Sequence, residues 1–73
     1  MKKVCIDPGH GGHDPGACAN SIRESDLVLT IALMVRDMLA PHVDVLMTRD
    51  NDQFVSLSER CNMANDADCD IFV

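Results

Sequence analysis

Aromatic side chains are almost absent from this chain, and clusters of basic side chains are absent altogether. Its 73 residues include two Phe and no Tyr or Trp, and six Lys and Arg are scattered along a chain with a formal net charge of −6. A nucleic-acid surface needs clustered Lys and Arg to neutralise phosphates, so this composition excludes nucleic acid as a partner. The remaining composition, 47% hydrophobic and 25% charged, is typical of a globular domain rather than a disordered segment.

Long apolar runs are also missing. The start, Met1-Lys2-Lys3, resembles the basic end of a signal peptide, but Asp7 and the glycines after it interrupt the apolar stretch that should follow. We therefore expect no signal peptide, no membrane span and synthesis in the cytoplasm. The length allows one domain at most, and a domain this small is often marginally stable without metal, disulfides or partners.

Three common binding motifs fail. The glycine spacing does not match Gly-x-Gly-x-x-Gly, and no Gly-Lys-Ser/Thr is present, which excludes a dinucleotide fingerprint and a P-loop. Residues 50–61 begin like a calcium loop, but the sixth position is not glycine and the twelfth is Cys61. An EF-hand is therefore excluded.

The cysteines lie at positions 5, 18, 61 and 69, and no two of them form a Cys-x-x-Cys pair. A disulfide framework is arithmetically possible. Cys5 and Cys69, however, fall within or beside apolar strand patterns, where a free thiol packs as a small hydrophobic side chain. We expect reduced, structural cysteines.

The most distinctive stretch is the ten-residue loop 7–16, Asp-Pro-Gly-His-Gly-Gly-His-Asp-Pro-Gly. It holds all four glycines, two of the three prolines and two of the three histidines. It follows a short apolar run and precedes a long helical pattern, which places it after a strand. Ligands of open α/β sheets bind at the carboxyl ends of the strands, so this loop predicts the active-site edge.

Hydrophobic patterns predict a βαβαβ order. Strands are expected at 3–6, 43–48 and 70–73, because these runs are short and apolar or β-branched. This order favours a twisted, mostly parallel sheet flanked by helices, with 3–6 and 43–48 paired in parallel. The last apolar run stops at Val73, where the covering helices of such a sheet would still be missing, so we expect a truncated domain.

Two capping boxes predict the starts of the helices. Ser21 and Glu24 fit the first, and the apolar positions that follow are spaced as in a mostly buried helix that Pro41 stops. Ser56 and Glu59 fit the second, which opens a short helix with one apolar face.

Two side chains are candidate metal ligands. His10 stands between two glycines, where nothing crowds a metal, and neutral imidazole is a common zinc ligand; the alternative is a solvent-exposed turn histidine. His13, three residues later, has no fixed geometry relative to His10 and is a weaker candidate. The capping box explains Glu24 fully, but its carboxylate could also point back to the loop and bind the same ion.

Three other charged residues have simpler interpretations. Asp7 and Asp14 each begin an Asp-Pro-Gly triplet, and we expect each to bind backbone amides of its turn. Arg49 follows the second strand and is expected to make a structural pair with a carboxylate, with substrate binding as the alternative.

Taken together, the motifs resemble the start of the zinc-dependent N-acetylmuramoyl-L-alanine amidases. The resemblance runs in order over essentially the whole chain, and the series is specific although each motif is weak. The matching segments are VCIDPGHGG at 4–12, DPGA at 14–17, ESDL at 24–27, LMTR at 46–49, VSLSER at 55–60, AN at 64–65, AD at 67–68 and IFV at 71–73.

The resemblance implies an α/β domain of amidase/phosphorylase-like architecture that cuts peptidoglycan between N-acetylmuramic acid and L-alanine with Zn²⁺. It carries two zinc ligands over to His10 and Glu24 and none to His13. The family's third ligand, a histidine, and its catalytic glutamate are expected after Val73. Residues 1–73 would then be the N-terminal segment of a single catalytic domain, with no catalytic residue of their own.

These implications predict a cell-wall hydrolase. The expected lack of a signal peptide favours a phage or prophage lysin, or an enzyme released by lysis, that reaches the wall after release. One alternative is a non-catalytic fragment that binds wall material or a protein partner. Another is an unrelated α/β domain whose glycine loop holds an anion. The resemblance further predicts weak zinc binding by two ligands alone, no wall lysis by the chain alone and possible self-association through its uncovered apolar surfaces.

Overall fold

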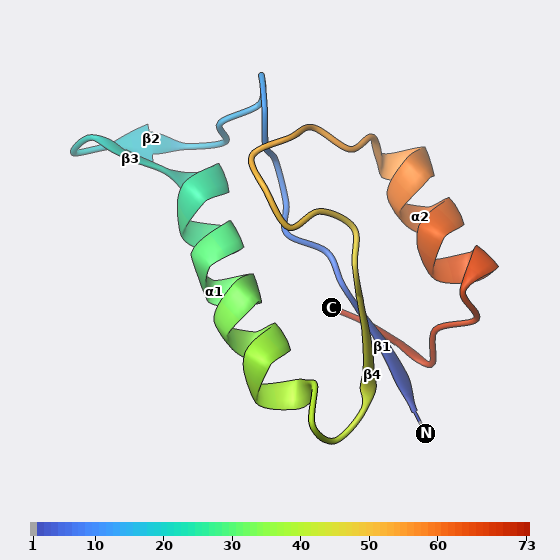
Figure 1. The fold of residues 1–73 in the computed structure, drawn as a ribbon. Helices are drawn as coiled ribbons and strands as arrows, with labels where there is room; N and C mark the ends of the chain where they lie inside the picture. Colours follow the sequence, from blue (N-terminus) through green and yellow to red (C-terminus); the bar gives the residue numbers. More distant parts are fainter. Residues whose placement is uncertain (1) are drawn as a thin grey trace.

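A computed structural model of the chain describes residues 2–73 (Figure 1). Three strands form one sheet and two further strands form a separate hairpin. The elements in chain order are β1 (Lys3–Ile6), β2 (Cys18–Ala19), β3 (Ile22–Arg23), α1 (Glu24–Leu39), β4 (Asp44–Met47), α2 (Leu57–Asp66) and β5 (Ile71–Phe72).

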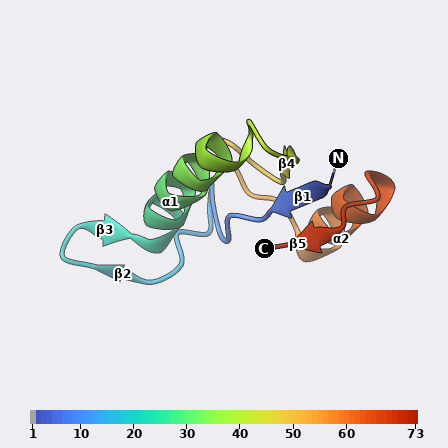
Figure 2. The same cartoon turned by 90° about the horizontal axis from the view of Figure 1, so that it is seen from below.

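The sheet is parallel and has the order β4-β1-β5. β1 pairs with β4 from Lys3 opposite Asp44 to Ile6 opposite Met47, and with β5 through Cys5 opposite Phe72. The predicted parallel pairing of 3–6 with 43–48 is confirmed, as is the α/β class. The first crossover runs from β1 to β4 and the second from β4 to β5, in the opposite direction across the sheet. Right-handed connections therefore place α1 and α2 on opposite faces, which Figure 2 shows with the sheet nearly edge-on.

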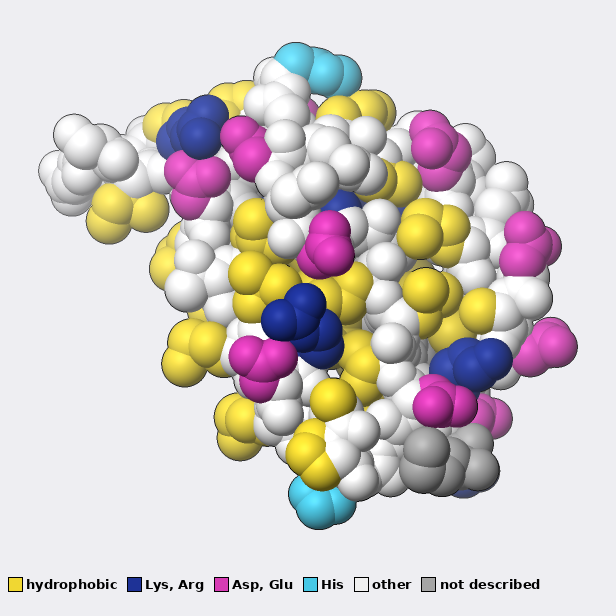
Figure 3. Space-filling model, in the orientation of Figure 1, with side chains coloured by type: hydrophobic (Ala, Val, Ile, Leu, Met, Phe, Trp, Pro, Cys, Tyr) yellow, Lys and Arg dark blue, Asp and Glu magenta, His cyan; other side chains and the backbone are white. Residues whose placement is uncertain are grey.

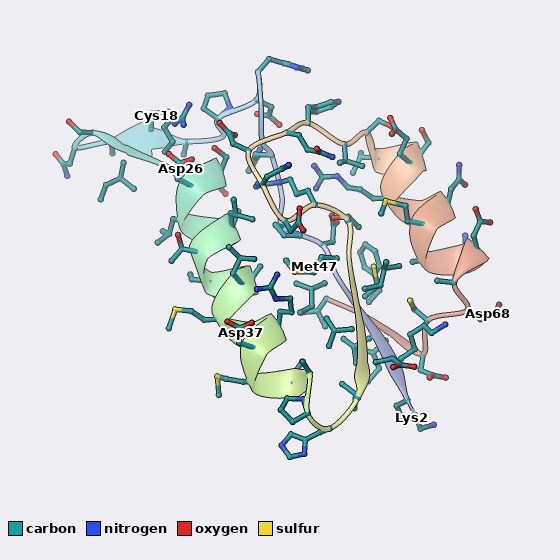
Figure 4. The ribbon with its side chains drawn as sticks, in the orientation of Figure 1. Lys2, Cys18, Asp26, Asp37, Met47 and Asp68 are labelled. Carbon is teal, nitrogen blue, oxygen red and sulfur yellow. The ribbon has the colours of Figure 1, made fainter. Side chains whose placement is uncertain are left out.

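The core lies between α1 and the sheet. Val4 and Ile6 of β1 and Ala32 of α1 are buried there, and partly buried side chains surround them. Met47 at the end of β4 is one of these, and in Figure 4 it lies between α1 and the sheet. β1 is thereby fixed at the centre of the fold, and the loop that follows it starts from a rigid strand.

The prediction that the first helix is mostly buried is wrong. Among the helix's residues only Ser25 and Ala32 are buried, and Figure 3 shows hydrophobic side chains along the outer side of α1. A three-stranded sheet contacts only one stripe of a helix, so the wide apolar surface predicted from the sequence has no second layer to pack against. The exposed apolar side chains of α1 include Leu27, Ile31, Met34, Val35 and Met38.

The first capping box is also wrong, whereas the second is confirmed. α1 begins at Glu24 with Arg23 as its N-cap and no side-chain cap. Ser21 instead lies in the turn of the β2–β3 hairpin, where positive φ at Asn20 (52°) and at Ser21 (64°) suits a two-residue turn of the primed type. At α2 the Ser56 hydroxyl accepts from the Glu59 amide at 3.2 Å.

Along residues 2–73, no helix combines the length and the hydropathy that a membrane span requires. α1 ends at Leu39, just before Pro41, as predicted.

Candidate metal centre

The glycine loop lies at the carboxyl edge of the sheet, as predicted. The Asp7 amide donates to Val73 O beyond β5 at 2.7 Å, and the Asp7 carboxylate accepts from the Thr48 hydroxyl beyond β4 at 2.8 Å. These contacts tie the start of the loop to both neighbouring strands.

Three side chains meet at this edge. His10 Nδ1 is 3.0 Å from Asp14 Oδ2, and His10 Nε2 is 3.2 Å from Glu24 Oε1. Glu24 is the first residue of α1, and its Oε1 also accepts from the Ala17 amide at 3.0 Å. The structure therefore brings the two predicted ligands together and adds Asp14 on the far nitrogen of the imidazole.

The charges around His10 favour a cation between the ligands. With Nδ1 donating to Asp14, a neutral imidazole presents the lone pair of Nε2 to a carboxylate oxygen, and two lone pairs at this distance repel unless a proton or metal ion lies between them. The hydrogen bond to Asp14 raises the pKa of His10, and the carboxylates of Asp14 and Glu24 add to the rise. The hydrogen bond from the Ala17 amide lowers the pKa of Glu24, and the charge of His10 lowers it further by a smaller amount.

Gly16 makes this approach possible. Its φ is +68°, and a Cβ built on it would lie 2.7 Å from both Glu24 Oε1 and His10 Cδ2. Both distances are shorter than any real Cβ contact, so a side chain here would push the two ligands apart.

Two buried arginines hold the backbone of the loop. Arg60 of α2 donates to Pro8 O at 3.2 Å and His10 O at 3.1 Å, and forms an ion pair with Asp7 at 3.0 Å. Arg49 donates to Pro8 O at 3.2 Å and to Gly9 O at 2.7 Å. His10 has a φ of 63°, an unfavourable conformation for a residue with a side chain, and these bonds offset that strain.

Of the two aspartates expected to bind amides of their own turns, Asp14 does so and Asp7 does not. Asp14 accepts from the Gly16 amide at 3.1 Å, as expected of its turn. The Asp7 carboxylate accepts from the Thr48 and Arg60 side chains rather than from amides of its own turn. The loop leaves the sheet at Asp7, so this carboxylate faces the neighbouring elements.

Two predictions concerned His13 and Arg49. His13 stacks on Phe54, with ring centroids 4.4 Å apart, rather than joining His10. Arg49 has a structural role, as expected, but its bonds to Pro8, Gly9, Ser25 and Asn51 all go to carbonyl oxygens instead of a carboxylate.

Comparisons with known proteins show the family to which the chain belongs. A family model described as N-acetylmuramoyl-L-alanine amidase matches residues 4–73. The chain belongs to this amidase family. It is 47% identical over 76 residues to the sporulation-specific N-acetylmuramoyl-L-alanine amidase of Bacillus subtilis (strain 168), and that match covers 100% of this chain and 30% of the relative. It is 46% identical over 74 residues to an endolysin of Bacillus phage SPP1, covering 99% of this chain and 27% of the endolysin.

Solved amidase structures have the same fold. The catalytic domain of CwlV, an N-acetylmuramoyl-L-alanine amidase from Bacillus (Paenibacillus) polymyxa var. colistinus, superposes with a TM-score of 0.93 at 37% identity, covering 99% of this chain and 42% of that chain. The amidase AmiC2 of Nostoc punctiforme gives 0.93 at 40% identity, covering 97% and 41%. This amidase-family chain thus spans about 30% of the first curated relative and 42% of the first of these solved chains.

The donors in this amidase-family chain suit zinc. Imidazole nitrogen and carboxylate oxygen are both zinc ligands, with bonds of about 2.0–2.2 Å, so two tetrahedral ligands lie roughly 3.3 Å apart. The separation of Nε2 and Oε1 matches this at 3.2 Å, and Asp14 stands where a carboxylate orients a ligating histidine. Within residues 2–73 no group of three or more His, Cys, Asp or Glu side chains is placed to hold a metal ion.

The four cysteines are free thiols, as expected. Cys5 is fully buried in β1, and burial raises its pKa to about 11, with smaller contributions from Cys69 and Asp7.

Sequence reasoning did not assign Arg60 to the loop, because nothing in a helical arginine indicates that it folds inward across the sheet edge.

Proposed function

We propose that this chain is part of a peptidoglycan hydrolase that cleaves the amide bond between N-acetylmuramic acid and L-alanine with zinc-activated water. The observation that supports this most is the convergence of His10 and Glu24, 3.2 Å apart, with Asp14 behind the imidazole. Family membership supports the same chemistry, since the matching model is named for that amidase.

In this proposal His10 and Glu24 hold the zinc ion. Asp14 keeps the proton on Nδ1, which leaves Nε2 free to bind metal, and the Ala17 amide holds the Glu24 carboxylate in place. Zinc, when bound, lowers the pKa of a water molecule and polarises the scissile carbonyl. The residues of this chain bind and orient, and no residue among them is proposed as the catalytic acid or base.

Four wider statements are part of the proposal. Residues 1–73 form one segment of a single amidase catalytic domain, and peptidoglycan is the partner. The protein acts on the cell wall after release from the cytoplasm. Two protein ligands hold zinc less tightly than the three of a complete catalytic site, so we expect weak zinc binding and no amide cleavage by this chain alone.

Zinc affinity of the 73-residue chain tests the ligand assignment. We expect His10→Ala and Glu24→Gln each to weaken binding at least tenfold in a chelator-competition titration. His42→Ala is the matched control, because His42 is exposed in the connection between α1 and β4 and should leave the affinity unchanged. If His13→Ala weakened binding as much as His10→Ala, the assignment would be wrong and His13 would be a ligand.

Amide cleavage tests the statement about activity. Release of L-alanine-terminated peptides from purified peptidoglycan should stay at background with the chain and saturating zinc. Zinc-dependent cleavage by the chain alone would contradict our view that further groups are needed, and a wall-binding but zinc-independent chain would favour a non-catalytic role.

A further inference from the structure

Cys5 lies on the face of the sheet that α2 covers. Val4 and Ile6 of β1 pack against α1, so Cys5 between them points to the opposite face. Lys3, on the same face as Cys5, extends to the end of α2, where its Nζ donates to Ala67 O at 2.8 Å. Cys5 is therefore buried on the α2 side of β1, outside the core that the sheet shares with α1.

Cys61 and Cys69 lie on the same side of the sheet. Both line a hollow of about 280 Å³ between α2 and β5, which we call the α2–β5 hollow; its other lining residues are Ala64, Asn65, Asp70 and Phe72. Phe72 is the residue paired with Cys5 in the sheet, which brings the hollow next to Cys5. Neither proposed metal ligand lines the hollow, so these thiols form a cluster separate from the metal centre.

The backbone holds Cys69 against β1. The Cys69 amide donates to Ala64 O at 3.1 Å, and the next amide, that of Asp70, donates to Lys3 O at 2.8 Å. Burial raises the pKa of Cys5, and the neighbouring Cys69 adds to this rise through its charge and a side-chain hydrogen bond. The two thiols are thus neighbours, one buried and one partly exposed at the hollow.

We propose that Cys5 and Cys69 are an oxidation site, at which a low-molecular-weight disulfide such as oxidised glutathione converts the two thiols into a disulfide between β1 and the start of β5. The metal centre takes no part in this reaction, so the inference goes beyond the proposed function and does not rest on it. In the proposed function the protein acts outside the cytoplasm, where disulfides persist, whereas the cytoplasm keeps thiols reduced.

The exposure of the two thiols sets the order of the reaction. Cys69, at the hollow, attacks one sulfur of oxidised glutathione as a thiolate and releases one reduced glutathione, which leaves a mixed disulfide on Cys69. The buried Cys5 then gives up its proton and attacks the Cys69 sulfur, which releases the second glutathione. The two protein thiols lose two electrons, and one glutathione disulfide is reduced to two thiols.

The bridge suits the spacing of the sheet and requires one small movement. Neighbouring strands lie about 4.8 Å apart, within the range of about 4.4–6.8 Å between the Cα atoms of a disulfide. Cys69 precedes Phe72, the residue opposite Cys5, by three positions, so closing the bond draws Cys69 along the strand. The connection from α2 to β5 can absorb this shift, because Cys69 lies outside both elements and beside the hollow.

The test is oxidation of the full 73-residue chain by oxidised glutathione, followed by mass spectrometry. A protease that cleaves before aspartate places each cysteine on its own fragment, namely 1–6, 14–25, 52–65 and 68–69. The folded chain should lose the mass of two hydrogen atoms and give 1–6 linked to 68–69 as its main product. Linkage of 52–65 to 68–69, which would make Cys61 the partner, or a chain that keeps four thiols would overturn the inference.

The same oxidation in concentrated urea is the control for the fold. Cys61 and Cys69 are eight residues apart, whereas Cys5 and Cys69 are 64 residues apart. Loop-closure entropy in the unfolded chain then favours the Cys61–Cys69 pair by roughly twentyfold. A main product that changes from Cys61–Cys69 in urea to Cys5–Cys69 in buffer would show that the fold selects the pair, and the same product under both conditions would contradict this.

Two variants test the assignment independently of the fragments. Cys69→Ala should abolish the loss of two hydrogen atoms, and because Cys69 is only partly buried this variant should still fold. Cys18→Ala is the matched control and should oxidise like the parent chain, since Figure 4 shows Cys18 on the hairpin, far from the connection at Asp68. Equal oxidation of the Cys69→Ala variant and the parent chain would refute the site. His10→Ala should weaken zinc binding and leave the disulfide unchanged, so this inference and the proposed function can fail separately.

Discussion

Replacement of Arg60 by alanine should unfold most of the chain or leave it barely stable. The Arg60 side chain is only 5% exposed, and its guanidinium donates to Val55 O at 2.7 Å as well as to the loop. Removing one partner of a buried ion pair costs about 3–5 kcal/mol, because the other charge stays buried and uncompensated. Here the charge left behind is Asp7, which would retain only its bond from Thr48.

That loss is large on the scale of the whole chain. At roughly 0.05–0.15 kcal/mol per residue, a protein of this length has a free energy of unfolding of about 4–11 kcal/mol. Urea denaturation followed by circular dichroism at 222 nm should therefore show little or no folded baseline for Arg60→Ala. Arg60→Lys should lower the free energy of unfolding less, since the lysine ammonium still places a positive charge beside Asp7. It cannot donate to all the carbonyls that the guanidinium contacts.

Arg36→Ala is the control for this experiment. Arg36 is a half-exposed arginine on α1, and among the described residues its guanidinium pairs only with its neighbour Asp37, at 3.1 Å. Its loss should change the free energy of unfolding by no more than about 0.5 kcal/mol. The reasoning fails if Arg60→Ala costs under about 1 kcal/mol or no more than Arg36→Ala, because the buried pair would then contribute nothing that a surface pair does not.

Three further predictions concern Gly16 and the cysteines. Gly16→Ala should weaken zinc binding at least tenfold in the chelator-competition titration, because its Cβ would meet both His10 and Glu24; an unchanged affinity would contradict the ligand geometry. Iodoacetamide at pH 8 should label exposed Cys18 within minutes and Cys5 only on unfolding, as mass spectrometry of the peptides can measure; rapid labelling of Cys5 would show that β1 is not buried. The pKa of Cys5 is raised from 9.0 to about 11, so between these pH values the folded state keeps a proton that the unfolded state loses. The free energy of unfolding should therefore fall by up to about 2–3 kcal/mol between pH 9 and 11, as urea titrations can measure. Cys5→Ala should abolish that part of the pH dependence.

The sequence predicted the sheet well because strand signals here are local. Each of the three strands is a short apolar or β-branched run next to turn residues, and the βαβ order leaves parallel pairing as the favoured topology. The second helix was equally clear, since Ser56 and Glu59 have no competing interpretation and form the expected cap.

The first helix was predicted less well, because two signals overlapped. Ser21 and Glu24 fit a capping box, but positive φ at Asn20 and Ser21 forms a hairpin instead, and a turn without glycine gives little warning of this. The same error concealed the geometry of Glu24. Its carboxylate binds the Ala17 amide across the hairpin rather than the N-cap amide.

Half of the candidate site could be predicted and half could not. His10 and Glu24 were named from the residues and from the family resemblance, and the structure places them in contact. The orienting role of Asp14 and the bonds from Arg60 depend on how the loop folds back, which no spacing along the chain encodes. Arg60 is 50 residues from His10, and only the crossover of α2 over the sheet brings them together.

The folding of the loop fixes where His10 and Glu24 lie, independently of how many ligands the metal ion has. His10 and Glu24 are brought together by a hairpin, a glycine without a side chain at Gly16, and two arginines, all within residues 2–73. Their approach therefore depends on local packing rather than on the metal. In the proposed site, zinc would meet two ligands already at a tetrahedral separation, so a third ligand would add affinity without having to move the first two. This is why we expect Gly16→Ala, which alters the position of the ligands, to weaken zinc binding even though Gly16 cannot itself bind the ion.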